Sequence, residues 1–77
     1  MNKSKIFEKY EKKMDTLYTC YYYSKRCGFQ KAMKDYNEQL QAVRIFTQEL
    51  LGERWRKRIY HADMEIDFRI RPFGDKR

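Results

Sequence analysis

The sequence contains few of the residues from which catalytic and metal sites are built. It has one histidine, His61, and two cysteines, Cys20 and Cys27. A Ser-His-Asp or Cys-His site needs histidine as its base, and no glycine-rich turn surrounds either cysteine. Zinc motifs place paired cysteines two to four residues apart, whereas these two are seven apart. We therefore expect no catalytic and no metal-binding residues, and we interpret both cysteines as small, semi-buried hydrophobes.

Glycine is scarce as well. The three glycines stand alone at positions 28, 52 and 74, so the chain has no glycine-rich loop that could cradle a phosphate group. Two neighbouring carboxylates, Glu65 and Asp67, share one face of the strand predicted below with Arg69 and Arg71. Salt bridging explains such a pair better than acid–base catalysis. We expect neither an enzyme nor a bound cofactor.

Long apolar runs are absent. No segment approaches the roughly 18 apolar residues that a membrane span requires. No apolar stretch follows the first lysines, as it would in a secretory signal. Because thiols stay reduced in the cytoplasm, a chain with two cysteines and no secretory signal suits that compartment. We expect a cytoplasmic protein that does not insert into a membrane.

Positive charge, by contrast, is abundant. The chain carries 18 Lys and Arg against 11 Asp and Glu, a net charge of +7. The excess lies in residues 1–28 and 53–77, and the segment between them is neutral. This balance favours nucleic acid, a membrane surface or an acidic protein as the partner. A hydrophobic share of 42% is too high for a disordered chain, and 77 residues predict one small domain, 1–77, that is marginal as a monomer.

Apolar residues at helical spacing predict two helices, over about residues 4–27 and 29–51. Ser4 would be the N-cap of the first, and Gly52 suits the residue after the second. Residues 16–24 are rich in strand formers, but the apolar stripe enters them without a phase break, so we favour helix. The expected core residues are Tyr10, Met14, Leu17, Met33, Tyr36, Leu40, Val43 and Phe46.

Gly28 determines how these two helices are connected. If it ends the first helix, the two fold into an antiparallel hairpin. If the helix continues through this glycine, the result is one helix of nearly 50 residues, which would need a dimer partner. The apolar spacing that runs through Tyr21 predicts an apolar residue at position 28, but the next apolar residue is Phe29. This shift of one residue favours a break between two helices. A repeat of seven continues straight through the glycine and supports the long helix, so a homodimer stays open; its members are Tyr22, Phe29, Tyr36, Val43 and Leu50.

The spacing of the apolar residues changes after Gly52. Apolar residues alternate strictly with charged ones from Met64 to Arg71, a period of two that predicts a half-buried strand, and Pro72 would end it. Residues 55–61 could supply a second strand, with a turn near His61, although Glu53 to Tyr60 could equally form a short helix. The predicted fold class is mainly α with a small β element (α+β). An antiparallel helical hairpin is followed by a basic segment and strand-like tail over residues 53–77. This tail forms a short C-terminal strand or β-hairpin.

The densest charge surrounds the only tryptophan. In the cluster Arg54–Arg58, four of five residues are cations, and a guanidinium offers planar donors to phosphate or carboxylate. Three consecutive tyrosines, 21–23, cannot all face one core, so at least one ring should be exposed, next to further cations. The candidate partner-binding residues are Arg54, Trp55, Arg56, Lys57, Arg58, Tyr23, Lys25 and Arg26.

Two functions fit these features. The first is a non-enzymatic inhibitor or adaptor that docks on a larger protein or nucleoprotein complex. Such a chain resembles, in class only, the small accessory proteins of phages and mobile elements, including anti-CRISPR-like inhibitors. The second is a regulator that binds RNA or DNA directly without sequence specificity. No recognition motif supports sequence-specific binding, because the predicted helices are too long for a helix-turn-helix.

Overall fold

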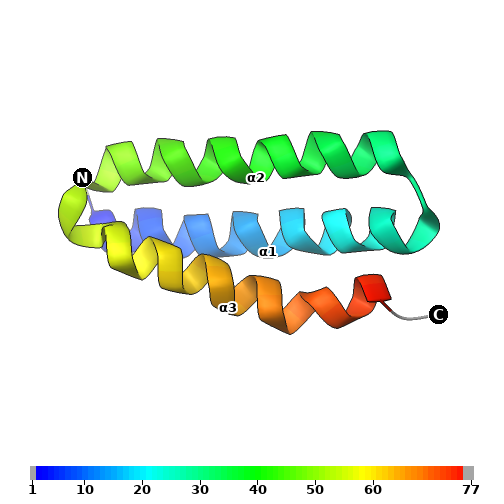
Figure 1. The fold of residues 1–77 in the computed structure, drawn as a ribbon. Helices are drawn as coiled ribbons and strands as arrows, with labels where there is room; N and C mark the ends of the chain where they lie inside the picture. The colour runs from blue at the N-terminus through cyan, green and yellow to red at the C-terminus, as the bar shows by residue number, and fades with distance from the viewer. Residues whose placement is uncertain (1, 76–77) are drawn as a thin grey trace.

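In the computed structural model, which describes residues 2–75, the chain forms helices joined by short turns (Figure 1). The elements are α1 (Lys3–Cys27), α2 (Gln30–Leu51), the one-turn 3₁₀ helix η1 (Glu53–Trp55) and α3 (Arg56–Asp75). Residues 2–75 contain no strand. The predicted α+β class is therefore wrong, and the fold is a helical bundle.

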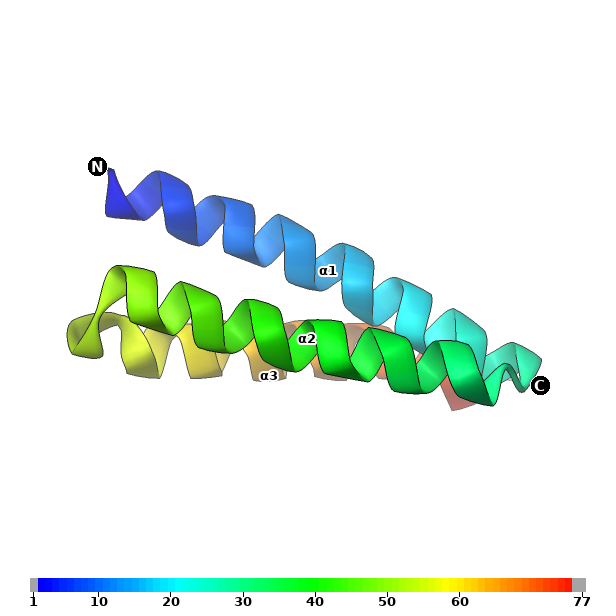
Figure 2. The same cartoon turned by 90° about the horizontal axis from the view of Figure 1, so that it is seen from above.

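α1 is the central helix of the bundle. Figure 1 shows it between α2, which runs antiparallel to it, and α3, which runs in the same direction as α1. Seen from above, α2 lies over α3, and α1 diverges from both toward its N-terminus (Figure 2). α1 packs extensively on both neighbours, whereas α2 and α3 make few contacts with each other. The core is consequently organised around α1.

The chain reverses direction at Gly28. This residue has a φ of 78°, in the left-handed region that only glycine adopts without a steric cost. Its N–H donates to the Lys25 carbonyl, and the N–H of Phe29 donates to the Ser24 carbonyl, which is the Schellman pattern. The single long helix is therefore not formed. At the other end of α1 the N-cap is Asn2 and not Ser4, because the Asn2 side chain accepts the Lys5 N–H at 3.3 Å.

The predicted strand over residues 64–71 is part of α3. Successive residues of a helix turn by about 100°, so two residues spaced by two lie on nearly opposite faces. Ile66 and Ile70 are buried, whereas Met64 and Phe68 are exposed. The buried apolar residues of α3 lie three or four apart, as Ile59, Ala62, Ile66 and Ile70. Strict alternation thus places apolar side chains on two faces of one helix. The predicted β-hairpin is wrong for the same reason.

Pro72, which we expected to end a strand, lies inside the last turn of α3. It removes one helical N–H, the donor that the Phe68 carbonyl would otherwise accept, so its cost is confined to the helix end. Two residues further on, Gly74 permits α3 to approach α1 closely. A Cβ atom at this position would lie 2.6 Å from Cδ1 of Tyr22.

The core differs from the expected one because α3 covers a second face of α1. Of the expected residues, Tyr10, Met14, Leu17 and Leu40 are buried. Met33, Tyr36 and Val43 are half-buried, and Phe46 is 63% exposed. The core also contains Ile66 and Ile70, which we had placed on the apolar face of a strand. The buried apolar residues outside both expectations are Tyr18, Tyr22, Leu51, Ile59 and Ala62.

A polar cluster joins all three helices at the centre. Asp63 of α3 accepts a hydrogen bond from the Tyr18 hydroxyl of α1 at 2.7 Å. It also pairs with the Arg44 guanidinium of α2, Nη2 to Oδ2, at 3.1 Å. The Asp63 side chain is 11% exposed, so water competes little for these bonds. This cluster links α2 to α3, which otherwise touch little.

Replacing Asp63 by alanine should therefore destabilise the fold strongly. Removing one member of a buried ion pair leaves the other charge unpaired, and because Arg44 keeps some access to water we expect a loss of about 2–4 kcal/mol. Urea unfolding followed by circular dichroism measures it. Asp75→Ala is the matched control, since Asp75 pairs with Lys25 at the surface and should contribute less than about 1 kcal/mol. Equal losses in both variants would contradict the central role of Asp63.

Candidate functional site

The predicted basic cluster lies at one end of the bundle, where α2 ends and η1 and α3 begin. Arg54, Arg56 and Lys57 are exposed there, and we call these three residues the basic corner. They surround a shallow hollow whose wall is completed by α2 and by the first turn of α3. The other lining residues are Arg44, Gln48, Glu53, Ile59 and Tyr60.

Local geometry produces this corner. Gly52 ends α2 with a φ of 93°, and its N–H donates to the Gln48 carbonyl at 2.9 Å. The Trp55 N–H then donates to the Gly52 carbonyl at 3.1 Å. This hydrogen bond starts η1, which leads directly into α3. The cations thus stand at the N-terminal end of a helix. Since that end carries partial positive charge, the position is unfavourable for a cation.

Little within the protein compensates this charge. Among residues 2–75, Arg56 forms the corner's one ion pair, with Glu53 at 3.6 Å between Nη1 and Oε2. Both side chains are mostly exposed, so the pair is weak. The basic corner therefore stores unfavourable electrostatic energy that an external anion could relieve.

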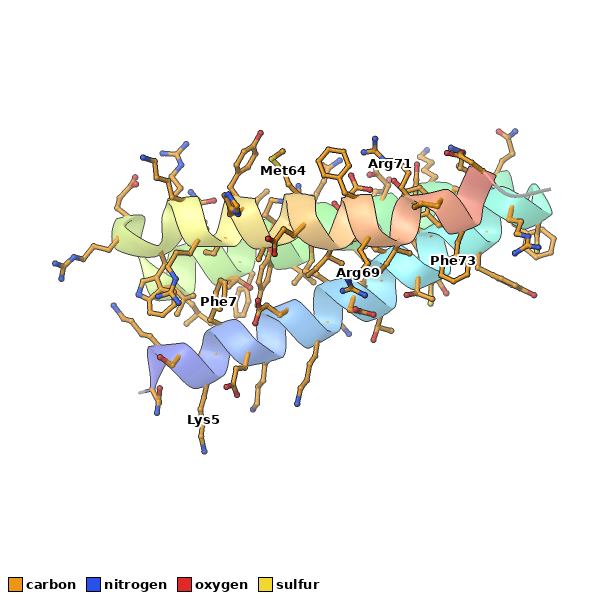
Figure 3. All side chains as sticks on the ribbon, turned by 90° about the horizontal axis from the view of Figure 1, so that it is seen from below. Lys5, Phe7, Met64, Arg69, Arg71 and Phe73 are labelled. Atoms are coloured by element: carbon orange, nitrogen blue, oxygen red, sulfur yellow. The ribbon has the colours of Figure 1, made fainter. Side chains whose placement is uncertain are left out.

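Trp55 does not stand beside the corner's cations as an exposed ring. It is half-buried, and its ring centroid lies 5.5 Å from that of Phe7 on α1. Arg58 also departs from the corner, because its guanidinium lies 4.3 Å from the centroid of the Trp55 ring and 5.3 Å from that of Phe7. Figure 3 shows Phe7 between α1 and α3. Through their contacts with Phe7, Trp55 and Arg58 thus pack η1 and α3 against the N-terminal part of α1.

Replacing Trp55 by alanine should accordingly lower stability. The loss of a half-buried aromatic ring with its aromatic and cation–π contacts is expected to cost about 2–3 kcal/mol. Thermal or urea unfolding measures the difference. Arg54→Ala is the matched control, because this neighbouring side chain is exposed and its loss should change stability by less than about 0.5 kcal/mol. A Trp55→Ala protein that unfolds like the wild type would contradict the packing role.

The second predicted group, Tyr23, Lys25 and Arg26, lies at the opposite end of the bundle, near the turn at Gly28 (Figure 1). Tyr23 is 63% exposed, and together with Thr19, Arg26 and Phe73 it lines a small hollow. Lys25 pairs with Asp75 at 3.1 Å. Because the molecule is 42 Å long, the eight predicted residues do not form one continuous site.

The sequence analysis missed an apolar surface on α3. Tyr60, Met64 and Phe68 are 62%, 39% and 58% exposed, and their spacing of four places them along one helix face. We call these three residues the α3 stripe. Tyr60 also lines the hollow of the basic corner, so the two surfaces are continuous. Figure 3 shows Met64 pointing away from α1. The spacing of four was visible in the sequence, but Met64 and Phe68 were assigned to a strand that begins after Tyr60.

A second cationic surface lies on the far side of α1. Lys5, Lys9 and Lys12 are exposed and fall on one helix face by their spacing of four and three. Figure 3 shows Lys5 directed away from the other helices. None of the three forms an ion pair with any residue that the structure describes. We call this group the α1 basic face.

The acid–base behaviour of three buried tyrosines is strongly altered. Burial, reinforced by the hydrogen bond to Asp67, raises the pKa of Tyr22 to about 12. Burial also raises the pKa of Tyr10 and of Tyr18 well above the usual value, and the carboxylate of Asp63 adds to both shifts. All three groups belong to the core or its edge, and they affect stability at alkaline pH.

No arrangement within residues 2–75 brings three or more His, Cys, Asp or Glu side chains together as metal ligands would require. Cys20 is half-buried and Cys27 is exposed, and both are free thiols. None of the described helices combines the length and the apolar character of a bilayer span. Comparison with protein families, with curated proteins and with solved structures found no match to this chain.

Proposed function

We propose that this protein is a small basic interaction protein without catalytic activity, which docks on an anionic surface of a larger protein or nucleoprotein complex as an inhibitor or adaptor. The observation that carries the proposal is the basic corner. Three exposed cations from two consecutive elements surround one hollow, with Tyr60 at its edge. In class, this description suits the small accessory inhibitors that phages and mobile elements carry.

Energetics support the corner as a functional surface. Cations at a helix N-terminus each cost about 0.3–1 kcal/mol when exposed. Solubility alone could be supplied by dispersed lysines. A carboxylate or phosphate from a partner would accept charge-assisted hydrogen bonds from Arg54 and Arg56 and would also interact favourably with the end of the helix.

The α1 basic face supports a second candidate, a regulator that binds nucleic acid without sequence specificity. Its three lysines lie along one side of a helix and have no acidic partner in residues 2–75. Lysines arranged in this way can follow a phosphate backbone without contacting bases. The two candidates therefore use different faces of the bundle, which makes them separable by mutation.

Neutralising the basic corner should reduce binding to a polyanionic protein surface. The triple variant Arg54→Ala, Arg56→Ala and Lys57→Ala is compared with Lys5→Ala, Lys9→Ala and Lys12→Ala, which removes the same charge. The probes are poly-glutamate and a 20-nucleotide single-stranded DNA, titrated by fluorescence anisotropy. We expect the corner variant to bind poly-glutamate at least about tenfold more weakly, because direct charge-assisted contacts are lost, and the α1 variant to bind it nearly as well as the wild type.

The same titrations distinguish the second candidate. If the α1 variant loses DNA binding and its salt slope falls by about two, while the corner variant keeps both, the lysines contact phosphates and the nucleic-acid function is favoured. Equal weakening of both variants toward both probes would mean that binding follows net charge alone. Neither surface would then be a site, and the proposed function would be wrong.

A further inference from the structure

We propose that the α3 stripe is a docking surface for one amphipathic α-helix of a partner protein, whose acidic end lies on the basic corner. This inference rests on the function proposed above, because it specifies the chemistry and the secondary structure of the partner. It depends on the exposure of the stripe, its continuity with the corner and the distribution of charge around it.

The stripe exposes more apolar surface than the fold requires. Tyr60, Met64 and Phe68 point away from the core-facing side of α3, which is formed by Ile59, Ile66 and Ile70. These three side chains are therefore not part of the core. Large apolar side chains exposed in a row on one helix face favour an interaction site.

The shape of the stripe suits a helix as its occupant. Three residues spaced by four form a straight ridge about 12 Å long, at 1.5 Å per residue. A partner helix presents the complementary spacing when its apolar residues recur three and four apart. Met64 at the centre is flexible and polarisable, so it can adapt to aliphatic side chains. Tyr60 and Phe68 have flat rings, but Met64 between them interrupts any stacking platform for successive bases, which favours protein over single-stranded nucleic acid.

The charge around the stripe sets the orientation of the partner. At its N-terminal end the stripe meets the basic corner, where Lys57 precedes Tyr60 by one turn and forms no ion pair within residues 2–75. At the other end the positive charge is partly compensated, because Arg71 pairs with Asp67 at 2.7 Å and its guanidinium lies 5.0 Å from the centroid of the Phe68 ring. A helix with carboxylates concentrated toward one end would complement this gradient.

The same charges disfavour a second copy of this chain as the occupant. A twofold axis through Met64 would place Tyr60 of each copy opposite Phe68 of the other. It would also place Lys57 opposite Arg71 at both ends of the contact. Like charges facing each other oppose association, and Asp67 compensates only the arginine. A parallel arrangement would bring the two basic corners together and would be worse.

Selection from a display library tests the proposal without knowledge of the natural partner. The full-length protein is the bait, and the probe is a library of random 16-residue peptides. We expect the enriched peptides to carry apolar residues three and four apart, with Asp and Glu toward one end. Enrichment of peptides without this pattern, or no enrichment, would overturn the inference.

Mutations locate the binding surface for the best selected peptide, measured by fluorescence anisotropy. The double variant Met64→Gln and Phe68→Gln should bind at least tenfold more weakly. Ile45→Gln and Phe46→Gln is the matched control on α2, where both residues are similarly exposed, and should change affinity less than twofold. Circular dichroism checks that both variants fold. A weaker effect at the stripe than at the control would overturn the inference.

Further measurements separate this inference from the proposed function. If the selected peptides ignore the stripe while poly-glutamate still requires the basic corner, the docking helix is wrong and the proposed function stands. If neither the selected peptides nor poly-glutamate depend on the corner, both are wrong. A dimer in sedimentation equilibrium that Phe68→Lys disrupts would instead assign the stripe to a second copy of the chain and overturn the inference.

Discussion

Leu40→Ala is expected to lower the free energy of unfolding by about 2–5 kcal/mol, a loss large enough to leave a domain of this size only marginally folded. Leu40 is 2% exposed and lies on the face of α2 that packs against the core. Removing its side chain leaves a cavity beneath α2 that the remaining side chains cannot fill without moving the helix. Urea unfolding monitored by circular dichroism gives the change directly.

Phe46→Ala is the matched control for Leu40. Both residues belong to the same predicted stripe on α2, but Phe46 is 63% exposed. Its replacement should change stability by less than about 0.5 kcal/mol, as is usual for surface positions. Comparable losses at the two positions would mean that the face of α2 that packs against α1 has been wrongly assigned.

Alkaline pH is expected to unfold the protein through its buried tyrosines. Above pH 10 these side chains ionise in the unfolded chain but remain protonated in the folded state, because burial raises the pKa of Tyr10, Tyr18 and Tyr22, the last to about 12. The folded state then binds more protons than the unfolded state, so stability falls as the pH rises. Each tyrosine contributes a slope of about 1.4 kcal/mol per pH unit between its two pKa values, and three contribute about 4.

The slope is measured by urea unfolding at intervals between pH 9 and 12. Tyr10→Phe provides the internal comparison, because Tyr10 makes only a long hydrogen bond, 3.4 Å from its hydroxyl to the Ile59 carbonyl. Every other titrating group is shared with the wild type, so the difference between the two slopes belongs to Tyr10. We expect the variant's slope to be smaller by about 1.4 kcal/mol per pH unit. Identical slopes would show that Tyr10 ionises without opening the core.

The first two helices were predictable from the sequence because their apolar stripes have one consistent phase. The glycine at position 28 was also informative, since it coincides with a slip in that phase. The tyrosine run followed geometry too: Tyr22 is buried and Tyr23 is exposed, because three consecutive helical positions cannot all face one core. These features depend on local spacing alone.

The third helix was not predictable in the same way. Alternation from Met64 to Ile70 describes a strand with one buried face, but it equally describes a helix with two apolar faces, and nothing local distinguishes them. A longer window would have favoured the helix, because Ile59, Ile66 and Ile70 continue at helical spacing. Without that helix, α1 was assigned one buried face, so Tyr18 and its partner Asp63 were left out of the expected core.

The candidate site was predicted in composition but not in geometry. The sequence shows a dense group of cations around Trp55, yet only the fold shows that Trp55 and Arg58 turn inward onto Phe7 while the corner faces outward. The α3 stripe was missed because Met64 and Phe68 were assigned to the buried face of a strand, and Tyr60 to a separate segment before it. Assigning function to a side chain required knowing which helix face it occupies.

The central position of α1 also affects how the chain must fold as it is synthesised. α1 is made first, yet Tyr18 and Tyr22 find their carboxylate partners 45 residues later, and Asp15 finds Arg69 54 residues later. As soon as α2 leaves the ribosome it can cover one side of α1, but the other side stays bare until α3 emerges. The nascent hairpin thus passes through a stage with an uncovered aromatic face, in which chaperones, proteases and neighbouring chains compete with the last helix for the same surface.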